Sequence, residues 1–423
     1  MSTPLCAVSP GPVSSANVTP RPAMPHRDDQ PSRLTRRALL AGASALGAGA
    51  IVTDGGSASA RATARVAPFY GGHQAGIATP RPGNVVLAGC DLRTPNRGRV
   101  GALLRTWTSA IATLTAGRPT DPADSGETTG QPVAGLTVTI GFGPSLFDGR
   151  FGLAARRPAA LTPLPTLSGD AIDERSSGGD LVIQACAEEL VVATHAVRQL
   201  LRLAGTTAGL RWLITGFAPS TANGEPTRNP LGFIDGTANP AVGSNAFATT
   251  VWVPPVSDQR WLVNGTFLCF RRIRIDLAAW DALSVADQQV VIGREKRSGA
   301  PLSGGSLKSP VNLSAHTPTG ALAIPPDSHV RLATPQENRG ATLFRRSFAY
   351  ERGADPPHGK LDAGLLFLTW VANPAIQFVP ILTALNSHDR LGQFTTHTAS
   401  GIWAVPPAPS RYSWLGEELL SGR

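Results

Sequence analysis

Residues 228–240, RNPLGFIDGTANP, form the part of this sequence whose residue types most plainly suit chemistry. Gly232 and Gly236 stand on either side of Asp235, and an Asn-Pro pair closes the segment. Glycine allows positive φ and close backbone approach, so the segment can bend tightly against a flat ligand and aim the carboxylate at it. An aspartate in that position can accept and return a proton. The alternative interpretation is an Asx-type turn between strands, which has no chemical role.

The wider context favours the first interpretation, because Gly-Phe-x-Asp-Gly-Thr-x-Asn-Pro resembles the signature of the dye-decolourising (DyP-type) peroxidases. Other segments resemble elements of that family in the same order along the chain: FYGGHQAGI at 69–77, IGREK at 292–296, SGAPL at 298–302, HVRLA at 329–333, LFRRSF at 343–348, GLLF at 364–367 and QFVP at 377–380. The resemblance runs from about residue 66 to about residue 407 and is strongest to exported bacterial members. Ser347-Phe348 departs from the family's commoner Gly-Tyr.

The resemblance implies an active site built around haem. His329 would be the proximal ligand, with one imidazole nitrogen on the iron, and Asp389 would accept the other N–H. Asp235 would take a proton from hydrogen peroxide and return it to the leaving oxygen. Arg345 would stabilise the charge that develops as the O–O bond breaks. From the residues alone, His329 could equally be a structural histidine, and Asp389 could equally be a helix cap.

The same resemblance supplies the remaining cofactor contacts. Arg294 would pair with a haem propionate, and Gly236 and Thr237 would lie against the haem. Leu366 and Phe367 would wall the cavity, although core residues of a strand look the same. Because the chain has no CxxCH motif, the cofactor would be haem b, one per chain, held without thioether bonds.

If such walls bury the haem edge, bulky donors must be oxidised at the protein surface. Trp370, Trp403 and Tyr350 are candidate relays for those electrons, and each is also a candidate core residue. Arg346, beside Arg345, is expected to be a surface arginine. His316 is expected to be a solvated loop residue and not a second ligand.

Hydrophobic periodicity predicts the elements that must position these residues. The first part has predicted strands at 84–90, 136–140 and 181–186 and helices at 99–115 and 187–203. The second part has predicted strands at 266–270, 272–275, 329–332, 342–350 and 365–371 and helices at 284–293 and 374–387. The β-α-β-β-α-β order is typical of a ferredoxin-like unit. We therefore predict an α+β fold of two ferredoxin-like halves, residues 61–240 and 241–423, with antiparallel sheets around a haem pocket, of the dimeric α/β-barrel type.

Composition limits the other possibilities. The chain carries 38 Lys and Arg against 29 Asp and Glu, but the arginines are scattered and form no basic run with interleaved aromatics, which argues against nucleic-acid binding. None of the four cysteines is spaced as CxxC, so zinc ribbons, iron–sulfur sites and thioredoxin chemistry have no support.

Residues 1–60 are predicted to be an export signal. Arg36-Arg37 precedes a mildly apolar run rich in Ala and Gly, and Ala58-Ser59-Ala60 offers a small-x-small cleavage site before Arg61. Paired arginines before a weak apolar core resemble a twin-arginine signal, so the twin-arginine translocase is an expected partner. That route exports folded, cofactor-loaded proteins to the cell envelope or beyond. Residues 1–23 are expected to be a mis-assigned extension, with Met24 as the start.

The sequence therefore predicts an exported haem peroxidase that reduces hydrogen peroxide and oxidises dyes, phenolics or similar small donors by single electrons. One alternative is a deferrochelatase, which removes iron from haem, because related exported members have that role. Another, of a different class, is an extracytoplasmic haem carrier. The resemblance also suggests a homo-oligomer.

Overall fold

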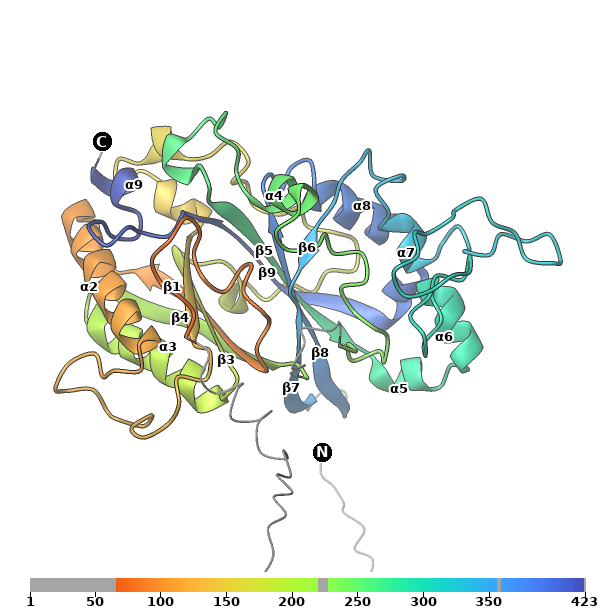
Figure 1. Ribbon diagram of the computed structural model, residues 1–423, viewed down its shortest axis with the longest axis horizontal. Helices are drawn as coiled ribbons and strands as arrows, with labels where there is room; N and C mark the ends of the chain where they lie inside the picture. The colour runs from red at the N-terminus through yellow and green to blue at the C-terminus, as the bar shows by residue number, and fades with distance from the viewer. Residues whose placement is uncertain (1–65, 220–226, 356–358, 422–423) are drawn as a thin grey trace, which may run out of the picture. The chain divides into compact units, whose positions relative to one another are not determined.

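Two α-helices and four antiparallel strands make up the first half of the chain. The elements are β1 (Asn84–Leu92), α2 (Arg97–Thr115), β2 (Thr137–Phe142), β3 (Leu181–Ala187), α3 (Leu190–Ala204) and β4 (Ala208–Phe217). The strands pair in the order β2-β3-β1-β4. Helices α2 and α3 lie side by side against this sheet (Figure 1). Trp107 of α2 fixes their contact, because its indole N–H donates to the carbonyl of Leu200 in α3 at 2.8 Å.

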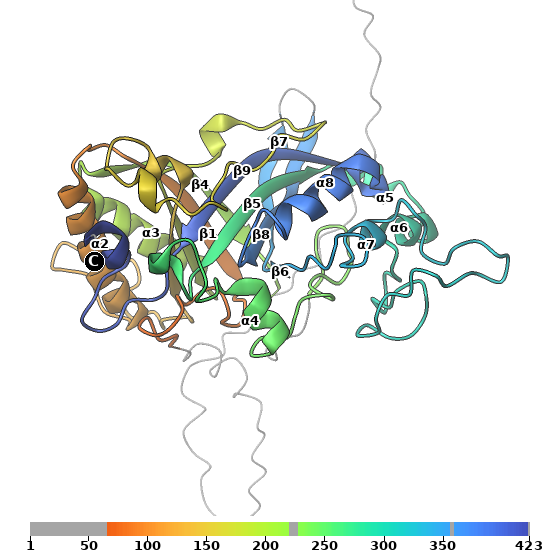
Figure 2. The same ribbon diagram turned by 90° about the horizontal axis from the view of Figure 1, so that it is seen from above.

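The second half repeats the strand order with longer connections. Its four main strands are β5 (Thr266–Ile275), β7 (Phe348–Asp355), β8 (Lys360–Val371) and β9 (Thr395–Val405). They pair antiparallel in the order β7-β8-β5-β9. The connection from β5 to β7 carries α5 (Leu277–Asp281), α6 (Val285–Ile292), α7 (His329–Leu332) and the short strand β6 (Phe344–Arg345), and α8 (Phe378–His388) precedes β9. Figure 2 shows α5 to α8 gathered beside this second sheet.

The shorter elements lie in the connections and at the end of the chain. They are α4 (Asn245–Val251), α9 (Glu417–Ser421) and the 3₁₀ turns η1 (Pro144–Phe147), η2 (Ala154–Arg156), η3 (Glu174–Ser176), η4 (Arg260–Leu262) and η5 (Arg390–Phe394).

The two sheets join at their edges and close on each other. Single pairs link β2 to β9, at Phe142 and Ala404, and β4 to β7, at Phe217 and Ala349. One apolar core fills the interior with residues from both sheets, including Leu87, Trp370 and Trp403. The predicted α+β fold of two ferredoxin-like halves is therefore confirmed. The boundary placed at residue 240 stays a prediction.

This computed structural model describes residues 66–219, 227–355 and 359–421. The predicted export signal at 1–60 lies outside the described residues. Within those residues no helix combines the length and apolar character needed to cross a membrane.

The segment 329–332 was wrongly predicted as a strand. It is one helical turn, α7, in which the Leu332 N–H donates to the Ser328 carbonyl and the Ala333 N–H to the His329 carbonyl. Four residues are too few for alternation to separate a strand from a helical turn. Strand β9 was not predicted, because its first residues are mostly Thr, His and Ser. The predicted strands 266–270 and 272–275 are one strand with an irregular register after Arg272.

Arg346 is buried and not, as predicted, a surface residue. Only 4% of it is exposed, and its guanidinium donates to the carbonyls of Thr79 and Pro80. Burial lowers the pKa of Arg346 to about 10. The three aromatic side chains considered as electron relays are core residues, each at most 1% exposed: Tyr350, Trp370 and Trp403. His316 is exposed, as predicted.

Candidate active site

A cavity of about 1010 Å³ is lined mostly by the second half of the molecule, with further residues from the segments 168–170 and 229–238. It is bounded by β5, β8, α8 and the connection that carries α6 and α7. Apolar side chains make up much of its wall: Leu231, Phe233, Leu343, Phe367, Ile381 and Leu382. This volume is at the upper end of the roughly 300–1,000 Å³ of ligand sites, so the cavity can hold a large, flat, apolar group.

His329 and Asp389 form a hydrogen-bonded pair in the cavity wall. His329 opens α7, and Asp389 follows α8. The His329 Nδ1–H donates to Asp389 Oδ2 at 2.7 Å, and the other carboxylate oxygen accepts the Leu391 N–H at 2.9 Å. Asp389 therefore both caps η5 and orients the imidazole. With Nδ1 engaged as a donor, the Nε2 lone pair is left available to a ligand in the cavity.

Asp235 and Arg345 also line the cavity. Arg345 Nε lies 3.7 Å from Asp235 Oδ1, and both side chains are about one-fifth exposed. The Asp235 backbone N–H donates to the Thr227 carbonyl at 2.8 Å, and the Gly236 N–H donates to Asp235 Oδ1 at 2.7 Å. Gly236 has a φ of 74°, which glycine adopts without strain. The predicted tight turn around Asp235 is thus present.

Two further residues hold this pair and were not singled out from the sequence. Asn239 makes two hydrogen bonds with the backbone of Arg345. Arg81 donates to the Ser347 carbonyl at 2.7 Å and to Thr227 Oγ1. Burial lowers the pKa of Arg81, and the charge of Asp235 partly offsets this effect. Asn239 stands in the quoted motif and could have been found there. Arg81 is isolated between two prolines and gave no signal.

The predicted cofactor contacts divide into two groups. Arg294, Thr237 and Phe367 line the cavity, whereas Gly236 and Leu366 do not. Leu366 belongs to the barrel core, because successive side chains of β8 point to opposite faces and Phe367 takes the cavity face. Gly236 shapes the turn, because its N–H donates to Asp235 Oδ1 and its carbonyl accepts the Asn239 N–H.

Arg294 is a buried cation of the cavity wall, and so is Arg271, which pairs with Asp170 at 2.9 Å. Arg294 is 6% exposed, and its Nη1 donates to the Gly299 carbonyl at 2.7 Å. Its Nε, also buried, has no acceptor among the described residues. Burial lowers the pKa of Arg294, and the charge of Arg345 lowers it further.

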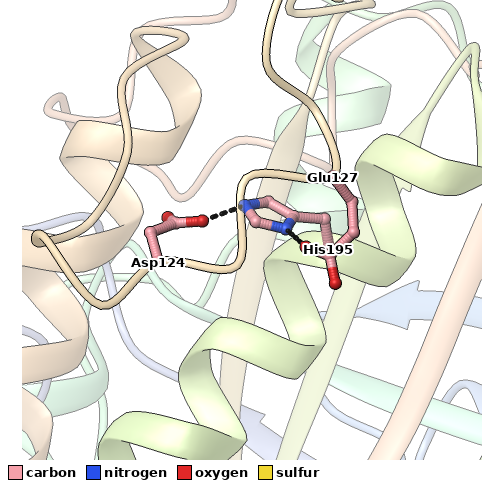
Figure 3. A group of neighbouring side chains, drawn as sticks. All are labelled: Asp124, Glu127 and His195. Atoms are coloured by element: carbon pink, nitrogen blue, oxygen red, sulfur yellow. Dashed lines mark hydrogen bonds and ion pairs between the residues drawn. The ribbon is translucent and has the colours of Figure 1, made fainter.

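A second group of ionisable side chains lies away from this cavity. His195 of α3 stands between two carboxylates of the loop after α2 (Figure 3). Its Nδ1 is 2.7 Å from Glu127 Oε2 and its Nε2 is 3.2 Å from Asp124 Oδ1. Both ring nitrogens of His195 therefore face carboxylates, and none of the three residues lines the cavity.

Comparison with known proteins agrees with the cavity geometry. The sequence model described as "Dyp-type peroxidase, N-terminal" matches residues 74–218, and "Dyp-type peroxidase, C-terminal" matches residues 226–410. The chain is 38% identical over 380 residues to the dye-decolorizing peroxidase of Thermobifida fusca (strain YX), covering 86% of each chain. The chain belongs to the DyP-type peroxidase family.

Other relatives of this DyP-type chain agree with that assignment. It is 33% identical over 373 residues to a deferrochelatase of Escherichia coli O157:H7, covering 84% of this chain and 87% of the relative. A solved DyP-type peroxidase of Streptomyces coelicolor matches with a TM-score of 0.82 and 40% identity, over 85% of this chain and 98% of that one. One from Cellulomonas bogoriensis matches with a TM-score of 0.80 and 38% identity, over 85% and 99%.

As a DyP-type peroxidase, the protein is an oxidoreductase that acts on peroxide with a haem cofactor. The residues present fit that cofactor. Within the part of the chain that the structure describes, the cavity offers an imidazole with a free Nε2, apolar walls for the porphyrin ring, and a buried guanidinium in Arg294 whose Nε lacks an acceptor. A haem carboxylate would supply an acceptor for such a cation.

Proposed function

We propose that His329 binds the haem iron through Nε2 and that Asp235 and Arg345 act on hydrogen peroxide in the same cavity. One observation carries the proposal: a His–Asp pair and an Asp–Arg pair, contributed by different segments of the chain, line one apolar cavity. Asp389 fixes the imidazole tautomer and, by accepting its N–H, makes Nε2 a better ligand. When bound, haem supplies the iron that takes up peroxide and the redox equivalents passed on from donors.

Asp235 moves the proton in this scheme. Its carboxylate receives a proton from the peroxide oxygen that is held for reaction and returns it to the oxygen that leaves as water. The Gly236 N–H holds Oδ1 in place. The apolar wall around the pair excludes bulk water, which keeps the proton within reach of the leaving oxygen.

Arg345 provides fixed positive charge beside that carboxylate. A guanidinium 3.7 Å from Asp235 Oδ1 can stabilise negative charge on the departing oxygen. Arg294 would receive a haem propionate, and Thr237 and Phe367, which line the same cavity, would help to hold the ring. These contacts orient the cofactor.

The donors oxidised by the protein are small phenolics and dyes. The apolar wall admits small aromatic molecules, whereas Tyr350, Trp370 and Trp403 are too deeply buried to touch a bulky dye. Bulky donors would have to react at another, exposed position.

The test compares Asp235→Asn with Asp281→Asn, which changes an exposed carboxylate at the end of α5. The Asp235 variant should bind haem normally and react with hydrogen peroxide about 100-fold or more slowly. The Asp281 variant should match the wild type. An Asp235 variant that reacts as fast as the wild type would refute the role of Asp235.

Deferrochelatase activity is the second candidate, because relatives that align over most of this chain bear that name. The test incubates the haem-loaded protein with a reductant and an iron chelator in the absence of peroxide. Porphyrin fluorescence that appears only with the protein present would support this activity. Intact haem after many hours would leave peroxidase turnover as the function.

Export by the twin-arginine translocase, to the cell envelope or the medium, is part of the proposal and rests on Arg36-Arg37 and the cleavage motif before Arg61. Replacing both arginines by lysine should retain the protein in the cytoplasm. N-terminal sequencing of the exported wild type should begin near residue 61. A homo-oligomer is also proposed, and light scattering of the exported protein would show a mass above that of one chain.

A further inference from the structure

Asn239 binds both backbone polar groups of Arg345, the N–H and the carbonyl. Its Nδ2 donates to the Arg345 carbonyl at 2.7 Å, and the Arg345 N–H donates to its Oδ1 at 3.0 Å. This donor–acceptor pattern is the one that a neighbouring strand offers. The side-chain amide therefore takes the place of a strand partner.

Strand β6 needs such a partner. It has two residues and pairs with β8 alone, Phe344 opposite Trp370 and Arg345 opposite Thr369. The next residue, Arg346, donates its N–H to the Leu368 carbonyl of β8 at 2.9 Å. Because successive peptide groups of a strand point in opposite directions, the N–H and carbonyl of Arg345 face away from β8. Asn239 forms hydrogen bonds with both groups on that side of the strand.

The same turn that supplies Asn239 also holds Asp235. The Asn239 N–H donates to the Gly236 carbonyl at 3.0 Å, and the Gly236 N–H donates to Asp235 Oδ1. One short turn thus fixes the carboxylate at one end and the backbone of Arg345 at the other. The separation of 3.7 Å between the two charged groups depends on this link.

We infer that Asn239 is the positioning residue of the peroxide site, setting the place of Arg345 relative to Asp235. The inference rests on the proposed roles of those two residues. Arg81 independently ties Thr227 to Ser347, so the two segments stay together when Asn239 is removed. Loss of Asn239 should therefore disturb alignment more than folding.

The experiment compares Asn239→Ala, Asn239→Asp and Arg345→Leu with Asn96→Ala in haem-loaded protein. Asn96 caps α2 by accepting the Arg99 N–H at 3.1 Å and lies in the first half, outside the cavity lining, so its removal is a purely structural loss. The readouts are the rate constant with hydrogen peroxide, the affinity of the ferric haem for cyanide, the KM for a phenolic donor and the thermal midpoint. Asn239→Asp keeps the acceptor for the Arg345 N–H and loses the donor to its carbonyl.

Both Asn239 variants should react with peroxide about 10- to 100-fold more slowly, bind cyanide several-fold more weakly and keep the donor KM. Their thermal midpoints should fall by about 2–4 °C, no more than that of Asn96→Ala, which should change neither rate nor cyanide affinity. If the Asn239 variants keep the wild-type rate and cyanide affinity while Arg345→Leu loses both, the inference about Asn239 is wrong and the proposed function still stands. An Arg345→Leu protein that also behaves as wild type would overturn the proposed function beneath it.

Discussion

Two histidines of this chain use similar neighbours in different ways. His195 of the first half is 3% exposed and has a carboxylate at each ring nitrogen. His329 of the second half has one carboxylate, on Nδ1, and a side chain 36% exposed in the wall of the cavity. Only the doubly protonated ring can donate to two carboxylates at once. A neutral ring with one partner keeps a lone pair.

The surroundings of His195 complete the contrast. Along α3, Arg198 pairs with Glu127, and Arg202 pairs with Asp121 at 2.7 Å, so basic residues of the helix meet acidic residues of the loop after α2. Asp124 and Glu127 add their contacts with His195 to this set. The difference shows that an acidic neighbour does not make a histidine a ligand. In the proposed site it is the nitrogen of His329 left open toward the cavity that would bind.

The largest expected effect is the loss of haem from His329→Ala. Removing the imidazole removes the only iron-binding atom proposed here, so haem affinity should fall by roughly 100-fold or more. Titration of haemin into the protein, followed by the Soret band, measures this effect. His316→Ala, which alters an exposed loop histidine, is the matched control and should bind as the wild type. Equal affinities would remove His329 from the site.

Asp389→Asn should have the next largest effect. An amide can accept the His329 N–H but carries no charge, so the ligand becomes less basic, and affinity or activity should fall about 10- to 100-fold. Asp389 accepts the Leu391 N–H with its other oxygen, and asparagine has a single acceptor oxygen, so the variant that keeps the His329 bond also loses this cap of η5. Steady-state rates and haemin titration measure the change. An unchanged variant would mean that Asp389 acts only as a cap.

His195→Gln should destabilise the protein and leave the haem site unaffected. Glutamine cannot carry the charge that faces Asp124 and Glu127, and the free energy of unfolding should fall by about 2 kcal/mol, less than for a fully buried pair because Glu127 is partly exposed. Urea unfolding of the whole protein measures the loss of stability, and haemin titration shows whether the haem site is affected. Weakened haem binding with unchanged stability would mean that His195 acts in haem binding and not in stabilising the fold.

The smallest expected effect is a pH dependence of the His195 region. Hydrogen bonds, the first of them from Ser125, with help from His195 and Arg198, lower the pKa of Glu127 to about 2. The stabilisation is therefore complete above the unfolded value of about 4.5 and is lost as the pH falls toward 2. Glu127→Gln should be less stable than the wild type at pH 6, and this gap should close in acid. If the stability difference between the two proteins grows in acid, Glu127 does not stabilise the fold as a carboxylate.

Much of the fold was predictable, because apolar alternation and helical spacing marked β1 to β3, α2 and α3 closely. The failures have physical causes. The turn that carries His329 is too short to show a period, and β9 begins with polar residues that lie only partly buried. Burial of Arg346 depends on the Thr79 and Pro80 carbonyls, which are distant in sequence and not visible in a local pattern.

The sequence allowed the main residues of the candidate site to be named, but not the contacts that hold them in place. Asp235 and Arg345 were named from a resemblance, yet nothing local shows that Asn239 joins them or that Arg81 lies behind them. Leu366 was expected to line the cavity, but it packs in the barrel core, and its neighbour Phe367 lines the cavity. Because both faces of β8 are apolar, the sequence does not show which of the two side chains points to the cavity.

The most direct test of the central claim is resonance Raman spectroscopy of the ferrous haem-loaded protein. If His329 binds the iron and Asp389 accepts its other N–H, the wild type should show an iron–imidazole stretching band. That band should move to lower frequency in Asp389→Asn and stay in place in His195→Gln. A band that Asp389→Asn leaves unchanged, or one that persists in His329→Ala, would show that another residue holds the iron.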